Sequence, residues 1–226
     1  MARPGTWRVE ILAIFRKELA SELRTRSGLA TVALFSIAAV VAVAWASFNI
    51  RLSGSLASGL LWVTLLFSAA VALPRAFVSE EEQGTGDLLR LMARPESVFW
   101  GKSLYNLSLM LITGAVLSIL FFALVQVEVQ HPILYAICLL GSCASLAGAV
   151  TLCGALVAQA SGRGALAGAI AIPLLLPLVA LGVAGMRVAL GEGFMKGGEE
   201  AAFGLICYGV ASMVIGPALF AAIWKN

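Results

Sequence analysis

The chain has 226 residues, of which 61% are hydrophobic and 12% are charged, and its mean hydropathy is +0.98. Soluble domains carry about 25% charged residues, so this composition excludes a soluble globular protein, whose surface needs more polar groups. The long, continuous apolar runs also exclude the alternating pattern of a membrane β-barrel. The sequence therefore predicts an all-α polytopic membrane protein with a single transmembrane domain over residues 1–226.

The first predicted element is a helix over residues 6–26. Basic residues are spread along this segment, and apolar residues recur every four positions, at Trp7, Ile11, Phe15, Leu19 and Leu23. This pattern favours an amphipathic helix that lies in the membrane interface, with its basic flank toward anionic lipid headgroups. The alternative is a cytoplasmic helix that packs on a partner protein.

Six apolar segments follow, each near the roughly 20 residues that a membrane span needs. They cover residues 29–48, 56–73, 104–125, 133–157, 165–183 and 201–223. The fifth and sixth contain prolines, which remove backbone donors and are expected to kink these helices. Between them, the Gly-rich segment 183–200 fits either a re-entrant hairpin or a loop.

An even number of spans places both termini on the same side of the membrane. That side would carry twelve of the fifteen Lys and Arg residues, and the other side only Arg51, Arg187 and Lys196. Positive residues are retained in the cytoplasm. Both termini and the polar segment between spans 2 and 3 are therefore predicted to be cytoplasmic.

The polar segment covers residues 75–102 and is the longest charged interruption in the chain. Ser79, with Glu82 three residues later, forms a capping-box pattern that marks the start of a helix. Gly84 lies in a Gly-Thr-Gly sequence that breaks this helix, and Asp87 begins a second one.

Three apolar residues share one face of this second helix at helical spacing, namely Leu88, Leu91 and Met92. An apolar face flanked by charge on the cytoplasmic side is suited to a groove in another protein. We therefore predict a docking helix within residues 79–94. A surface helix that only rests on lipid is the alternative.

The chain contains no phosphate-binding loop motif, so ATP hydrolysis is expected on another chain. Its single histidine, His131, lies near Glu128 at the outer edge of the predicted bundle. A solvated histidine is the plain interpretation, and an axial haem ligand is the alternative. No charged residue lies near the centre of a span, so the usual marks of a proton relay are missing. We expect no catalytic residue, no metal site, no directly bound cofactor and no nucleic-acid partner.

The polar segment resembles the corresponding part of the CcmB family, the B subunits of haem exporters in cytochrome c maturation, which are similar to type-2 ABC exporters. The residues that match the family pattern are Arg75, Phe77, Glu80, Gly84, Thr85, Asp87 and Leu89, with Gly101-Lys102 at the entry to span 3. Pro95 arrives two residues later than in that pattern. A second match is Gly162-Arg163-Gly164, followed by a span rich in proline and leucine.

This resemblance implies that the chain is the permease subunit of an ABC transporter in the bacterial inner membrane, with residues 79–94 as its coupling helix. It implies an A-type ATPase partner, a second copy of the chain, haem-handling C and D membrane subunits and a periplasmic haem chaperone. ATP on the partner would drive haem export or release of the haem-loaded chaperone. The implied coupling residues are Arg75, Phe77, Glu80, Glu82, Gly84, Thr85, Asp87, Leu88, Leu91, Met92 and Arg163.

Two other functions remain open from the residues alone. One is a type-2 ABC permease for another substrate, such as a lipid, a drug or a polysaccharide. The other is a membrane scaffold that transports nothing. Apolar span interiors suit a hydrophobic ligand, and they equally suit a closed bundle that only transmits force.

Overall fold

The computed structural model describes residues 7–72, 84, 89, 91–158 and 163–224. This part of the chain forms seven helices and contains no strand, which confirms the all-α prediction for it. The helices are α1 (Trp7–Thr25), α2 (Ser27–Ala46), α3 (Gly54–Ala72), α6 (Pro95–Val125), α7 (Pro132–Ala158), α8 (Arg163–Ala189) and α9 (Met195–Trp224).

Four of these helices are long and apolar enough to cross a membrane, judged by length and composition. They lie in α2, α6, α7 and α9, over Gly28–Ala46, Pro95–Val125, Pro132–Ala155 and Met195–Ala222. α3 and α8 contribute shorter apolar stretches, over Gly54–Ala70 and Pro173–Ala189. The structure thus supports four of the six predicted spans, and spans 2 and 5 remain predictions.

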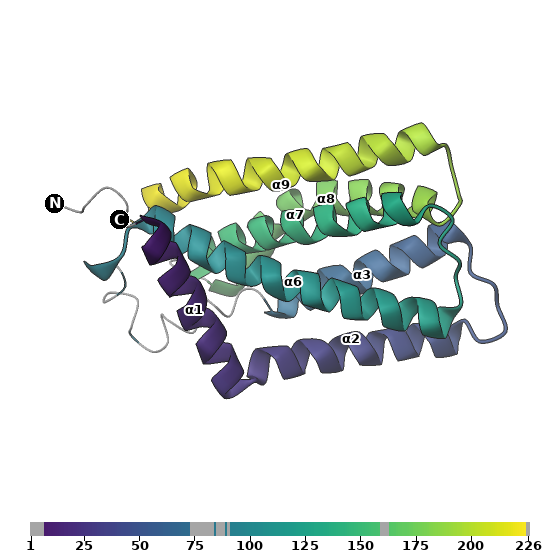
Figure 1. Cartoon of the computed structure of the whole chain (residues 1–226), viewed down its shortest axis with the longest axis horizontal. Coiled ribbons are helices and arrows are strands. Elements are labelled where there is room, and N and C mark those ends of the chain that lie inside the picture. Colours follow the sequence, from purple (N-terminus) through teal and green to yellow (C-terminus); the bar gives the residue numbers. More distant parts are fainter. Residues whose placement is uncertain (1–6, 73–83, 85–88, 90, 159–162, 225–226) are drawn as a thin grey trace.

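The helices after α1 run along the long axis of the molecule, and α1 lies across one end of this bundle (Figure 1). The start of α1 and the end of α9 lie at this end, which we call the α1 end. The connections α2–α3, α6–α7 and α8–α9 lie at the opposite end, which we call the far end.

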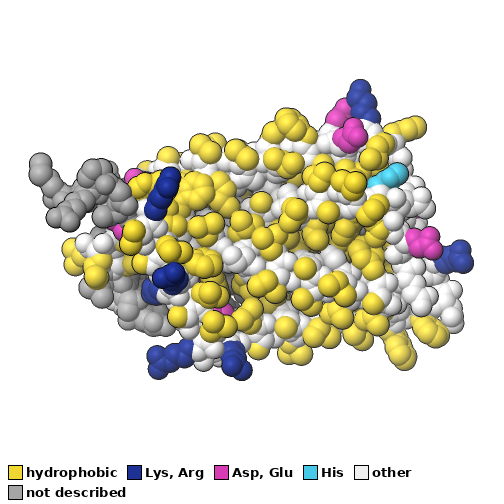
Figure 2. All heavy atoms as spheres, in the orientation of Figure 1, with side chains coloured by type: hydrophobic (Ala, Val, Ile, Leu, Met, Phe, Trp, Pro, Cys, Tyr) yellow, Lys and Arg dark blue, Asp and Glu magenta, His cyan; other side chains and the backbone are white. Residues whose placement is uncertain are grey.

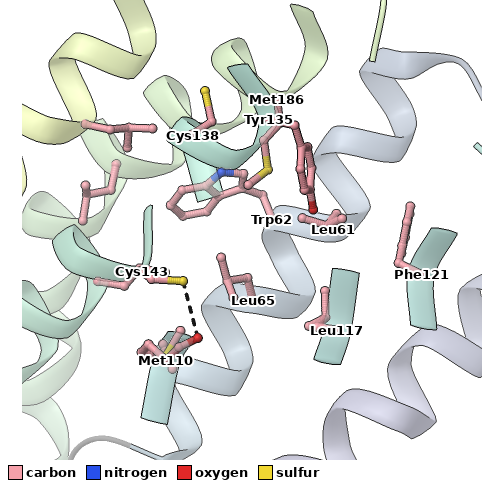
Figure 3. Packing of buried hydrophobic residues seen from close by; sticks show 14 of the residues in the cluster. Leu61, Trp62, Leu65, Met110, Leu117, Phe121, Tyr135, Cys138, Cys143 and Met186 are labelled. Atoms are coloured by element: carbon pink, nitrogen blue, oxygen red, sulfur yellow. Dashed lines mark hydrogen bonds between the residues drawn. The ribbon is translucent and has the colours of Figure 1, made fainter. Parts of the chain in front are cut away.

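The main hydrophobic core forms where α3, α6, α7 and α8 meet, with α7 in contact with α6, α8 and α9. Trp62 of α3 is fully buried there, among Leu61, Leu65, Met186 and Cys138 (Figure 3). In a membrane, an apolar side chain gains little free energy by moving from lipid to a contact with another helix. Close packing and hydrogen bonds must therefore hold such helices together.

Small residues let the helix backbones of this bundle approach one another. A Cβ atom added to Gly141 of α7 would lie 3.1 Å from Leu205 Cβ of α9, and one added to Gly148 would meet Ser212. Buried hydroxyls supply hydrogen bonds between the same two helices, since Ser145 Oγ donates to Leu205 O at 2.7 Å. The small residues of α7 therefore serve packing within the chain.

The prolines do not interrupt the described helices. α8 continues through Pro173 and Pro177, and α9 continues through Pro217. Segment 183–200, predicted as a re-entrant hairpin or a loop, is divided between the end of α8, a turn over residues 190–194 and the start of α9. Gly191 and Gly193 allow this turn because both have positive φ, 93° and 122°.

Candidate functional site

The candidate site is the α1 end of the bundle, where a second, smaller hydrophobic cluster lies apart from the main core. It is built from α1, the first turns of α6, the end of α7 and the end of α9. Its buried members are Ile14, Val98, Phe99, Leu152, Ala155 and Phe220.

Aromatic and glycine contacts hold this cluster together. The rings of Phe99 and Phe220 have their centroids 5.9 Å apart in a tilted arrangement, which is favourable for an aromatic pair. A Cβ atom added to Gly101 would lie 2.7 Å from Ile14 Cβ, so the glycine lets α1 lie directly against α6. α1 is therefore closely packed on the helix that follows the predicted coupling segment.

The end of the coupling segment packs against the same cluster. Leu89 and Ala93 contact it, whereas Leu91 and Met92 are 87% and 75% exposed. Arg94 has an extended backbone, and Pro95 occupies the first turn of α6, where its missing N–H costs nothing. One side of this short segment thus joins the bundle, and the other presents two apolar side chains.

The remaining residues predicted for coupling are only partly described. Gly84 has a φ of +66°, which suits the predicted break in the backbone. Arg163 begins α8. The others lie outside the described residues, namely Arg75, Phe77, Glu80, Glu82, Thr85, Asp87 and Leu88.

His131, the predicted alternative haem ligand, lies at the far end, beside the start of α7. Its side chain is exposed, and its backbone N–H donates to Ala189 O at 2.9 Å. Within the described residues, no three His, Cys, Asp or Glu side chains are grouped so that they could hold a metal ion. The haem-ligand assignment of His131 remains a prediction.

The packed face of α1 differs from the predicted apolar stripe. Ile11, Ile14 and Glu18 are buried, whereas Trp7 and Leu19 of the stripe are exposed. Positions separated by three and seven residues lie on one side of a helix, so these three residues form one face. This face packs on α6 and includes Glu18, and the placement of the apolar stripe in the membrane interface remains a prediction.

Glu18 is buried because it meets a buried cation. Lys102 Nζ of α6 lies 3.0 Å from Glu18 Oε1, and Lys102 is fully buried. Buried charges are rare unless they are paired, so each of these side chains accounts for the burial of the other. This pair was not predicted from the sequence, although the helical spacing of Glu18 from Ile11 and Ile14 was a usable signal.

A second glutamate, Glu22, lies one turn further along α1. Its Oε1 accepts the Leu29 backbone N–H at 2.7 Å, at the start of α2, and its Oε2 accepts the Tyr105 hydroxyl of α6 at 3.4 Å. Arg26 has a left-handed backbone with φ 55°, which turns the chain sharply from α1 into α2. Glu22 therefore joins α1 to both α2 and α6.

The far end contains its own charged anchor, Glu192 of the α8–α9 turn. Its carboxylate accepts hydrogen bonds from the Ser55 hydroxyl, from Ser55 N at 2.8 Å and from Gly54 N at 2.7 Å. The hydrogen bond from the Ser55 hydroxyl has the largest effect on the pKa of Glu192, and the bond from the Ser55 backbone N–H comes next. Both hold this pKa below its ordinary value. The carboxylate thus caps the start of α3.

A cavity of about 800 Å³ also lies at the far end, between the α2–α3 and α6–α7 connections. Its lining includes Arg51, Glu128 and Gln130. Both exposed ends of the molecule therefore carry polar features, and the helix surfaces between them are mainly apolar (Figure 2).

The family model described as CcmB protein matches residues 9–225. The chain belongs to the CcmB family. A comparison with curated proteins gives no match. CcmB proteins are membrane components of haem export for cytochrome c maturation, and the matched range includes most of α1, the coupling segment, Glu18, Glu22 and Glu192.

Proposed function

We propose that this CcmB protein is the permease subunit of an ABC transporter in the bacterial inner membrane, with six spans and both termini in the cytoplasm. ATP is hydrolysed on an A-type partner, since the chain contains no phosphate-binding loop motif. Haem is the substrate of the complex, either exported or released on its periplasmic chaperone. The complex also includes a second copy of the chain and the C and D membrane subunits.

The observation that carries this proposal is the two-sided end of the coupling segment. Leu91 and Met92 are exposed at the α1 end, outside the helices that cross the membrane, while Leu89 and Ala93 pack against the bundle. An exposed apolar pair beside charged residues is suited to a groove in a soluble partner. The packed side then provides the contact through which movement of the partner reaches α6.

The mechanism follows from this arrangement. Closure of the ATPase dimer displaces the coupling segment, and Pro95 joins that segment directly to α6. α6 extends over 31 residues from the α1 end to the far end, so a displacement at its start is carried along the bundle. No step of this mechanism requires a charged residue inside the membrane.

The proposal is tested by co-purification of the chain with its ATPase. In the Leu91→Glu/Met92→Glu variant we expect the ATPase to be lost from the purified complex, because two charges replace the apolar contact. Phe194→Glu is the matched control, since Phe194 is 89% exposed but lies at the far end. Full retention of the ATPase by the double variant would contradict the docking assignment.

A second measurement tests the substrate. Deletion of the gene should abolish holocytochrome c and leave haem bound to its chaperone. Normal holocytochrome c in the deletion strain would contradict haem as the substrate. If the intact chain nevertheless co-purifies with the ATPase, the two results together would point to a type-2 permease for another substrate. If the intact chain does not bind the ATPase and its deletion leaves cytochrome c unchanged, a scaffold that transports nothing would be favoured.

A further inference from the structure

The contact between α1 and α6 contains a polar seam, defined here as Glu18 and Glu22 of α1 with Lys102 and Tyr105 of α6. The glutamates are four residues apart and their partners three apart, so each pair lies on one face of its helix. The seam therefore has two rungs, Lys102–Glu18 at 3.0 Å and Tyr105–Glu22 at 3.4 Å.

A buried ion pair is a poor way to stabilise a contact that apolar residues could form equally well. Its better attested use is to specify one register, because either charge becomes costly when it is separated from its partner. Sliding α1 along α6 would leave Lys102, which is fully buried, without Glu18. α1 and the first turns of α6 are therefore held in one relative position.

The seam continues into α2. The first backbone N–H groups of a helix have no partner within it, and Glu22 accepts one of them, that of Leu29. The Arg26 N–H donates to Glu22 O at 2.6 Å, which closes the left-handed corner between the helices. Glu22 thus connects the end of α1 to the start of the first membrane-spanning helix.

We propose that α1 is a strut that carries the displacement of α6 to α2 through the polar seam. This inference rests on the proposed function, in which the coupling segment displaces α6. The ATPase movement then reaches α2 by two routes, through the direct contact of α6 with α2 and through Lys102, Glu18 and Glu22. Glu18, Glu22 and Lys102 are positioning residues, since they set the relation between helices.

The test measures the position of α2 in the complex with the ATPase. Spin labels are attached to an Ile37→Cys, Val210→Cys variant, on exposed positions of α2 and α9, in a chain whose native cysteines are replaced by alanine. We expect the label distance to shift when ATP is trapped on the partner. In Glu18→Gln and Glu22→Ala variants this shift should be reduced, because only the direct contact of α6 with α2 remains, while ATPase binding is retained.

Variants that restore the ion pair distinguish a positioning role of Glu18 and Lys102 from an effect on folding. The Glu18→Lys/Lys102→Glu exchange restores the ion pair in reverse and should restore the shift, and Lys102→Arg should retain it. Arg16→Gln removes an exposed charge from the same helix and serves as the matched control. Glu22→Ala leaves the Glu18–Lys102 pair in place, so it tests the connection to α2 even if Glu18 variants fold poorly.

The two proposals fail in different ways. If the unmodified chain does not bind the ATPase, the proposed function is wrong. If it binds the ATPase but α2 does not shift with ATP, or the shift is undiminished in both Glu18→Gln and Glu22→Ala, the strut is wrong and the proposed function stands. An exchange variant that folds and binds the ATPase without regaining the shift also overturns the strut.

Discussion

At the scale of single residues, charged side chains at the α1 end and at the far end of the bundle have defined partners. Lys102 is fully buried and meets Glu18, and Glu192 at the far end caps α3. An unpaired charge in a low-dielectric interior is costly, so the buried Lys102 depends on its short contact with Glu18. Glu192 lies at the surface, where its carboxylate accepts the backbone N–H groups of Gly54 and Ser55. Substitution of either partner therefore tests the contact itself.

Glu192 makes stability depend on pH in a direction that can be predicted. Its pKa in the folded protein is lowered by the Ser55 hydrogen bonds. A lowered pKa stabilises the fold at pH values above the unfolded pKa, and this contribution is lost as the pH falls through the folded pKa. We expect the melting temperature in detergent to fall on acidification below about pH 4.5, the ordinary value for this group.

The Glu192→Gln variant should melt at a lower temperature than the unmodified chain near neutral pH, and the difference should shrink in acid. Glu199→Gln changes another exposed carboxylate of the same region and is the control. A constant difference between Glu192→Gln and the unmodified chain at every pH would contradict the predicted role of the carboxylate.

At the scale of elements, the fit between α3 and α8 depends on one glycine. The Trp62 ring of α3 occupies the space where a Cβ atom of Gly182 would lie, and Trp62 is fully buried. Interiors are close-packed, so the ring has little room to move away. The contact between these two helices thus requires the absence of a side chain at position 182.

We expect Gly182→Ala to destabilise the protein by about 1–3 kcal/mol, the usual effect of overpacking a core. Thermal unfolding in detergent measures this change. Gly197→Ala is the matched control because no atom lies within 4 Å of its added Cβ, and the exchange in a helix should be neutral or favourable by up to about 1 kcal/mol. Equal melting temperatures for the two variants would contradict the packing argument.

At the scale of the whole molecule, the described cations gather at one end. Seven side chains lie there on α1, at its corner with α2 or at the start of α6, namely Arg8, Arg16, Lys17, Arg24, Arg26, Arg94 and Lys102. The far end has Arg51, Arg187 and Lys196. Because Lys and Arg are retained in the cytoplasm, this asymmetry predicts that the α1 end faces inward.

Labelling with a membrane-impermeant thiol reagent tests this orientation. In a Cys207→Ser background, which removes the exposed native thiol, whole cells should label a Phe194→Cys variant and leave a Ser21→Cys variant unlabelled. Inverted membrane vesicles should give the opposite result and serve as the control. Labelling of the Ser21→Cys variant in intact cells would place the α1 end outside.

The sequence by itself determined the class, the position of most helices and the family, because hydropathy and local motifs are properties of short stretches. Composition excluded a soluble protein, and the residues around Gly84 and Asp87 pointed to the CcmB family that the match over residues 9–225 then showed. The sequence also predicted an apolar face of Leu88, Leu91 and Met92, of which Leu91 and Met92 are exposed and Leu88 lies outside the described residues.

Only the tertiary structure decided which faces meet, because that depends on residues far apart in the chain. Glu18 and Lys102 are 84 positions apart, and Glu192 and Gly54 are 138 apart, so no local pattern pairs them. The spacing of Glu18 places it on the face of Ile11 and Ile14, but its partner, Lys102, is brought opposite it only by the packing of α1 on α6. The polar seam that joins α1, α6 and α2 therefore exists only in the folded chain, where these three helices contact one another.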